Sequence, residues 1–285
     1  MSIKSHFSQT VKWLRFIILS GFVFTSLSAY ADKNQPLIFG VHPFQKPSKT
    51  YQMFLPIIEN LSKELDRDIT LVIGKNYDDI IHKHRTGQVH FGYFGPASYA
   101  VTSKDTTLFP LARIMMNGRG AFKGVIVARI DASINTIENI RGKRFAFGDT
   151  ESTLSHYIPH YMLLQNNISL KDLSKYAFTG NHDNVALNVL NGQYDAGGLK
   201  PQVARLYLDK GLKIIAQSQW IPEHLFAANQ YMDSNTRKQI QAALLGMDLN
   251  ILQAIKSSIT GIEMAKDSDY DPLRKIIEEV NKDPL

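Results

Sequence analysis

Hydrophobic and polar positions along the chain follow two alternating patterns. Short apolar runs, typical of buried strands, occur at residues 36–41, 69–73, 89–94, 108–115, 124–128, 145–147, 176–179 and 212–216. Segments with apolar residues three and four positions apart, typical of amphipathic helices, occur at 49–65, 77–86, 182–191, 234–256 and 270–281. Strands that alternate with helices predict an α/β protein with mostly parallel sheets, flanking helices and right-handed crossovers.

The chain is long enough to form two lobes. It has 285 residues, 44% of them hydrophobic, which is more than one small core requires. Two segments, near 116–123 and 205–215, are expected to cross between the lobes. The first lobe would then comprise residues 32–117 plus 212–285, and the second lobe residues 118–211. Loops that follow the carboxyl ends of the strands are the default place for a ligand.

The first 31 residues have the parts of a secretory signal peptide. Three basic residues precede an apolar run over 16–27, and the small-x-small sequence Ala29-Tyr30-Ala31 follows. The run is short for a membrane span, which needs about 20 apolar residues. We therefore expect cleavage before Asp32 and a periplasmic mature protein; an uncleaved anchor is the alternative.

Composition and motifs exclude several classes of protein. The net charge of +6 becomes +3 without residues 1–31, since that segment holds three basic residues and no acidic one. This weak excess, without a basic run, predicts no nucleic-acid binding. The absence of cysteine excludes disulfides, thiolate metal sites and thiol nucleophiles. No HExxH, GxSxG, Walker A or GxGxxG pattern occurs, so we expect no enzyme activity, no cofactor and no metal.

Four expected strand-to-helix junctions carry small or polar residues, at 46–51, 93–99, 148–155 and 180–183. The first turn of a helix has unpaired N–H groups and a partial positive charge, which together favour an anion. At any one junction, ordinary N-capping is the more common reason for such residues, so a single junction is weak evidence. Four such junctions, two from each expected lobe, predict an anion site in the cleft between the lobes.

Within these junctions, certain side chains are candidates to bind the ligand. Hydroxyls can donate to an oxyanion, His182 would lie in a first helical turn, and Asp183 could orient it. The alternatives are capping for the hydroxyls, a surface position for the histidine and core packing for the tyrosines. The candidates are Tyr51, Tyr93, Ser152, Thr153, Ser155, His182 and Asp183.

Several stretches together resemble one family. Gly92 to Tyr99, Ile140 to Asp149 leading into Ser152-Thr153, His182-Asp183 and Asn191 to Gly197 are similar to segments of the substrate-binding proteins of phosphonate, phosphite and phosphate ABC transporters. The resemblance extends through about residues 36–230. It implies a two-lobe periplasmic binding protein of the type II-like class with two crossover strands.

The resemblance also implies a ligand and a partner. Members of the family close on a phosphorus oxyanion, and the matching residues here are Ser152, Thr153, Tyr93 and His182. The expected partners are this small oxyanion and an ABC permease in the inner membrane, with the protein acting as a monomer. Members that bind an aminoalkyl phosphonate place acids near the amine, whereas this chain has Lys200 and Gln202 there, and Glu223 is the one obvious acidic replacement.

Three other functions remain open at the level of sequence. The protein could be a sensing module that reports to a membrane kinase. It could be a periplasmic metal-ion binding protein that uses pairs such as His82 with His84 or His156 with His160. It could also be a hydrolase with Ser152 as nucleophile and His182 as base, although no nucleophile motif supports that reaction.

Overall fold

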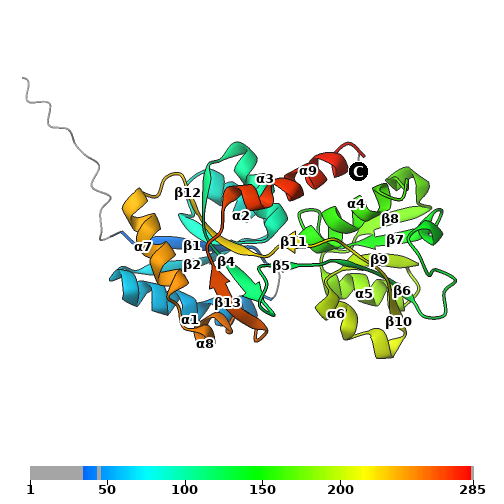
Figure 1. Cartoon of the computed structure of the whole chain (residues 1–285), viewed down its shortest axis with the longest axis horizontal. Helices are drawn as coiled ribbons and strands as arrows, with labels where there is room; N and C mark the ends of the chain where they lie inside the picture. Colours follow the sequence, from blue (N-terminus) through cyan, green and yellow to red (C-terminus); the bar gives the residue numbers. More distant parts are fainter. Residues whose placement is uncertain (1–34, 44–45, 284–285) are drawn as a thin grey trace, which may run out of the picture. The chain divides into compact units, whose positions relative to one another are not determined.

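The computed structural model describes residues 35–43 and 46–283, and the expected signal segment 1–31 lies outside them. Strands and helices alternate along much of the described chain, as the hydrophobic pattern predicts (Figure 1). The helices are α1 (Pro47–Leu65), α2 (Tyr77–Arg85), α3 (Pro96–Asp105), α4 (Ile158–Leu164), α5 (His182–Leu190), α6 (Pro201–Arg205), α7 (Ser234–Leu245), α8 (Leu249–Leu252) and α9 (Asp271–Val280).

A six-stranded sheet forms the centre of what we call the first lobe. Its strands are β1 (Leu37–Val41), β2 (Ile69–Ile73), β3 (Phe91–Phe94), β4 (Leu108–Met116), β12 (Leu225–Asn229) and β13 (Ile259–Glu263). They lie in the order β13-β4-β12-β3-β1-β2. The strand β1 pairs in parallel with β2 and β3, and the other three ladders are antiparallel.

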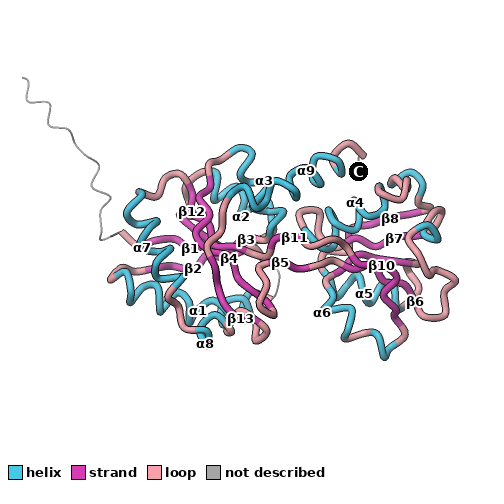
Figure 2. Tube along the Cα trace, in the orientation of Figure 1, coloured by secondary structure: helices cyan, strands magenta, loops and turns pink. Residues whose placement is uncertain are grey.

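A five-stranded sheet forms the centre of what we call the second lobe (Figure 2). Its strands are β6 (Val125–Arg129), β7 (Arg144–Phe147), β8 (Lys175–Phe178), β9 (Ala196–Leu199) and β10 (Leu212–Gln217). They lie in the order β10-β6-β9-β7-β8. The strand β7 pairs in parallel with β8 and β9, and the other two ladders are antiparallel.

Two short strands mark where the chain passes between the sheets. These are β5 (Ala121–Phe122), which follows β4, and β11 (Ile221–Pro222), which follows β10, and they pair antiparallel with each other. The strand β5 lies within the segment 116–123. The second crossing comes later than expected, because β10 pairs with β6 and buries Leu212 in the core of the second lobe. Residues 212–217 therefore lie with the second sheet and not with the first.

The sheets are also more mixed than the expected mostly parallel arrangement. Every antiparallel ladder of the two large sheets includes a strand that directly precedes or follows β5 or β11 in the chain. These strands are β4, β6, β10 and β12. A parallel pair needs a long crossover connection, usually a helix. The chain runs from β4 through β5 into β6 with no helix between them, so these strands do not enter the sheets by helical crossovers.

The hydrophobic pattern missed some elements and joined others. The central strand β12 has the sequence Leu-Phe-Ala-Ala-Asn and is buried at every position, so it shows no polar alternation. The expected helix over 234–256 is two helices, α7 and α8. The second begins at a new cap, where the Asp248 carboxylate accepts a hydrogen bond from the Asn250 N–H at 2.9 Å.

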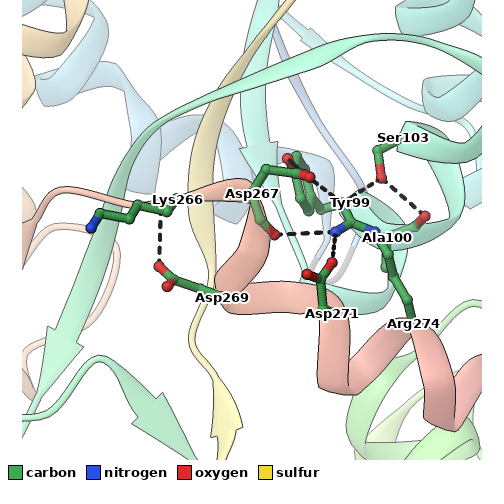
Figure 3. Close-up of polar contacts among 8 residues, drawn as sticks. All are labelled: Tyr99, Ala100, Ser103, Lys266, Asp267, Asp269, Asp271 and Arg274. Atoms are coloured by element: carbon green, nitrogen blue, oxygen red, sulfur yellow. Dashed lines mark hydrogen bonds and ion pairs between the residues drawn. The ribbon is translucent and has the colours of Figure 1, made fainter.

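The C-terminal helix α9 contacts both lobes, packing against α3 and α4. At its start, Arg274 bonds to the Ser103 hydroxyl at 3.0 Å and to Asp271 at 2.7 Å, and also pairs with Asp267 (Figure 3). Asp267 in turn accepts a hydrogen bond from the Tyr99 hydroxyl on α3 at 2.5 Å. Past its end, the Asp283 carboxylate accepts from the Leu170 N–H of the second lobe at 2.8 Å. The helix therefore has polar attachments to each lobe.

Candidate functional site

Strand-to-helix junctions from both lobes line a cavity of about 100 Å³, which we call the small cavity. Three of the four expected junctions contribute to it, at 95–98, 149–155 and 180–182. The fourth expected junction, at 46–51, does not, and His42 and Pro43 at the end of β1 line the cavity instead. The remaining described lining residues are Tyr77, Phe122, Lys200 and His224.

The serines after β7 form a hydrogen-bonded pair at the start of a single π-helical turn, Thr153–Tyr157. The Ser152 hydroxyl oxygen accepts from the Ser155 N–H at 3.3 Å and from the Ser155 hydroxyl at 2.7 Å. Because Ser152 accepts twice, its own O–H proton remains available for another acceptor. Pro159 follows in the first turn of α4, where a missing N–H costs no hydrogen bond.

Thr153 connects the two lobes. Its side-chain oxygen accepts from the Ala97 N–H, in the first turn of α3, at 2.9 Å. The residue is 6% exposed, and because its oxygen acts as the acceptor here, its hydroxyl proton can be donated to a different acceptor. Ser98 lines the same cavity, and its buried hydroxyl has no hydrogen-bond partner among the described residues. A buried hydroxyl without a partner is rare in a folded protein and suggests that a ligand or water completes it.

His182 is the first residue of α5, whose N-cap Asn181 accepts from the Asn184 N–H at 2.9 Å. The Nδ1 atom of His182 accepts from the Lys200 N–H at 3.3 Å. In the neutral ring the proton must then lie on Nε2, which makes this atom a hydrogen-bond donor. Burial, with the nearby charges of Lys200 and His224, lowers the pKa of His182 to about 3, so the ring is neutral at pH 7.

The wall from the first lobe is aromatic and contains a buried carboxylate. His224 stacks on Tyr93 with ring centroids 5.3 Å apart and a 14° interplanar angle. Glu223 is 2% exposed and accepts from the His224 N–H at 2.9 Å and from its Nδ1 at 2.8 Å. Burial raises the pKa of Glu223, but the His224 hydrogen bonds and charge outweigh it and the net shift is downward. Glu223 is therefore ionised at neutral pH.

Two further titratable groups face the small cavity from the second lobe. Burial raises the pKa of Asp149, and the charge of Asp78 adds to the rise. Burial also raises the pKa of Glu151, with further contributions from Asp78 and Asp149. These carboxyls are acceptors beside a set of donors, so the small cavity can recognise an anion that carries a proton.

A larger cavity of about 500 Å³, which we call the large cavity, adjoins the small one and shares Phe122, Lys200 and His224 with it. Tyr93 lines the large cavity. Its other walls come from α1, β4, α6 and the segment 253–257.

The structure thus divides the seven candidates. Ser152, Thr153, Ser155 and His182 line the small cavity, and Tyr93 lines the large one. Tyr51 is 49% exposed on α1, and neither it nor the exposed Asp183 is among the described lining residues of either cavity. The lining residues that sequence reasoning did not select as candidates include His42, Tyr77, Ser98, Asp149, Glu151, Lys200 and His224.

Position alone could have suggested two of these residues. His42 directly follows β1, and Ser98 lies in the first turn of α3. Ligand-binding residues are expected at both kinds of position, just after a strand and at the start of a helix. His224 precedes the central strand β12, which the pattern did not reveal.

The histidine pairs considered for a metal have other surroundings. His82 is exposed and His84 is buried, so they do not share a face. The Nε2 atom of His160 lies 2.9 Å from the Asp283 carboxylate, and His156 Nδ1 bonds to the Thr150 carbonyl. Within residues 35–43 and 46–283, no three metal-ligating side chains gather in one place.

Two lobes joined by crossing strands, with donors from both sides around one cavity, define a two-lobe ligand-binding protein. The model of the family described as "ABC transporter, phosphonate, periplasmic substrate-binding protein" matches residues 39–270. The chain belongs to this family, as the sequence motifs predicted.

Known relatives agree with this assignment. The phosphate-import protein PhnD of Mycolicibacterium smegmatis is 26% identical over 265 residues, which cover 82% of each chain. The probable ABC transporter phosphite-binding protein PhnD1 of Prochlorococcus marinus is 28% identical over 197 residues, 66% of each chain. The structure of PhnD1 from Prochlorococcus marinus in complex with methylphosphonate has a TM-score of 0.77 and 22% identity, and the match covers 86% of this chain and 98% of that one.

These findings confirm the expected two-lobe α/β fold and the expected family, which is one of transport proteins. Periplasmic location is implied by the family. In the part of the chain that the structure describes, no helix combines the length and hydrophobicity that crossing a bilayer requires.

Proposed function

We propose that this protein captures a phosphorus oxyanion in the small cavity and delivers it to an ABC permease. The observation that carries the proposal is a set of donors around one cavity that have no acceptor among the described residues. Hydroxyl protons of Ser152 and Thr153 and the His182 Nε2–H come from the second lobe, and the Ser98 hydroxyl comes from the first. An oxyanion can accept from all of them at once, whereas a neutral apolar ligand would leave them unpaired.

The donors lie on both lobes, which supports binding by lobe closure. Hinge closure around a ligand is established behaviour of periplasmic binding proteins. A ligand drives closure only through contacts that exist in the closed form. Each hydrogen bond to a charged group contributes about 1.5–3 kcal/mol. Three or four such bonds, divided between the lobes, are enough to offset a closure cost of a few kcal/mol.

The relatives supply three ligands to compare, namely phosphate, phosphite and methylphosphonate. Asp149 and Glu151 support a preference for an anion that keeps a proton at neutral pH, because a carboxylate can accept that proton. Sulfate has the same charge and shape but no proton, so it should bind more weakly.

A thermal-shift series followed by calorimetry tests the proposal. The mature chain is mixed with phosphate, phosphite, methylphosphonate, sulfate or zinc, and a ligand that binds the folded state raises the Tm by mass action. We expect one or more phosphorus oxyanions to raise the Tm and sulfate to do so least among the anions. His182→Ala should weaken the best ligand at least tenfold, because it removes the Nε2 donor. A Tm rise with zinc alone, or an unchanged affinity in His182→Ala, would contradict the proposal.

A further inference from the structure

The large cavity has no role in binding a bare tetrahedral anion. It holds about 500 Å³ against about 100 Å³ for the small cavity, and the two meet at Phe122, Lys200 and His224. An oxyanion held by the donors of the small cavity would therefore have open space beside it, toward the first lobe. A ligand with an organic substituent could place that substituent in this space.

The charge lining the large cavity is positive. Among the described residues that line it are three lysines, Lys49, Lys200 and Lys256, and one carboxylate, Glu223, which already accepts hydrogen bonds from His224. Within the described residues, neither Lys200 nor Lys256 forms an ion pair within 4 Å, and the Lys256 ammonium has only the Met116 sulfur at 3.9 Å. The cavity therefore presents ammonium groups whose charge no nearby carboxylate neutralises by direct contact.

Burial makes this arrangement costly without a ligand. It lowers the pKa of Lys200, which Lys49 lowers further, while Asp183 and Glu223 act in the opposite direction. Burial likewise lowers the pKa of Lys256, with Lys200 and Arg205 adding to the effect and Glu223 opposing it. An anionic group placed between these lysines would offset both the desolvation and their mutual repulsion.

Most of the remaining lining is apolar, although Gln202, Gln253 and Ser257 also contribute to it. Met53, Ile114, Met116, Val203, Leu206 and Ile255 contribute side chains from four separate parts of the chain. A short hydrocarbon spacer fits these walls, since it loses no hydrogen bonds there and removes apolar surface from water.

We propose that the ligand is an organophosphorus anion with a second acidic group, a carboxylate on a short alkyl spacer, and that Lys256 and Lys200 bind the carboxylate in the large cavity. This rests on the proposed function, because the phosphorus group occupies the small cavity. The proposed substituent is negatively charged, whereas that of an aminoalkyl phosphonate is positively charged. An ammonium group in the large cavity would face three lysines and be repelled by them.

Three probes of similar size separate the substituent's charge from its volume. Calorimetry on the mature chain compares 3-phosphonopropionate, which has an anionic tail, with propylphosphonate and 2-aminoethylphosphonate, which have neutral and cationic tails. We expect 3-phosphonopropionate to bind at least tenfold more tightly than propylphosphonate, and 2-aminoethylphosphonate to bind most weakly. Equal affinities for the anionic and neutral tails would overturn the proposal, and this comparison needs no variant.

A variant then assigns the effect to the large cavity. Lys256→Met keeps an unbranched side chain that is one atom shorter, and it removes the charge. It should reduce the preference for 3-phosphonopropionate over propylphosphonate at least fivefold and leave methylphosphonate affinity within about twofold. Lys238→Met, on the exposed surface of α7, makes the same change in net charge and should leave the preference intact.

The outcomes distinguish the two proposals. An unchanged preference in Lys256→Met, or an equal loss in Lys238→Met, would refute the lysine site while leaving oxyanion capture in place. Failure of every phosphorus compound, methylphosphonate included, would refute the proposed function itself.

Discussion

The small and large cavities adjoin each other but are built in different ways. The small cavity takes most of its donors from chain segments that are continuous in sequence, such as Ser152 to Ser155 and Gly180 to His182. Backbone geometry fixes those groups, because each belongs to the first turn of a helix or to the loop before it. The large cavity takes single side chains from α1, β4, α6 and the segments near 223 and 255.

This difference indicates which part of the binding site can change its residues without loss of the fold. Donors fixed by the backbone are pre-organised, so the small cavity should tolerate little change in its ligand's head group. Long side chains such as Lys256 and Met53 can be exchanged one at a time without breaking a helix start. We therefore expect the head group to depend on the small cavity and the substituent to depend on the large one.

The largest effect should follow from removing the Thr153 hydroxyl. Thr153→Val keeps the side-chain volume but deletes a donor to the oxyanion, worth about 1.5–3 kcal/mol for a charged partner. The affinity for the best phosphorus oxyanion should fall between about tenfold and a hundredfold. Calorimetry measures it, with Thr153→Ser as the matched control that keeps the hydroxyl and stays within about threefold. Wild-type affinity in Thr153→Val would remove this residue from the site.

The next effect concerns the rigidity of the small cavity. A Cβ at Gly148 would lie 2.1 Å from the Ser155 hydroxyl oxygen and 2.6 Å from its Cβ, so Ser155 would have to move. Gly148→Ala should lower the free energy of unfolding by about 1–3 kcal/mol, as overpacking does, and should also weaken anion binding. Urea unfolding measures the first effect. Gly261→Ala is the control, because its Cβ would meet only the Met115 sulfur at 3.7 Å; equal losses in both variants would contradict the argument.

Acid should destabilise the fold through His42, which lines the small cavity. Burial lowers the pKa of His42 to about 3, and the His224 and Lys200 charges contribute. Since this folded-state pKa lies below the value of about 6.5 in the unfolded chain, the unfolded state binds more protons as the pH falls. The resulting stability is fully present above about pH 6.5 and is lost progressively toward pH 3.

The free energy of unfolding should therefore fall less steeply with decreasing pH in His42→Asn than in the wild type. The difference should be about 1 kcal/mol over the first pH unit below 6.5. Urea unfolding at pH 7.0, 6.0 and 5.0 measures it. His82→Asn, at an exposed position on α2, should leave the pH dependence of the wild type unchanged. The same slope in all three proteins would show that His42 is not held neutral by the fold.

The difference between the cavities also explains what could be predicted from the sequence. The α/β class, the first crossing near residue 121 and four residues of the small cavity follow from local signals, namely strand runs, helix starts and hydroxyls next to them. The large cavity depends on which distant segments meet, and no local signal in Lys256 or Ile114 reveals that. The central strand β12 was missed for a related reason, because a strand buried on both faces has no polar alternation.

The smallest effects should come from the two candidates that lie away from both cavities. Tyr51 is 49% exposed on α1, and Asp183 is exposed in the first turn of α5. Neither group reaches the small cavity, so Tyr51→Phe and Asp183→Asn should each change the affinity for a phosphorus oxyanion less than twofold. Calorimetry with methylphosphonate measures both, beside Tyr93→Phe, since Tyr93 lines the large cavity. A tenfold loss in Tyr51→Phe would mean that α1 moves over the ligand on closure, and the two-cavity division would then need a third, mobile wall.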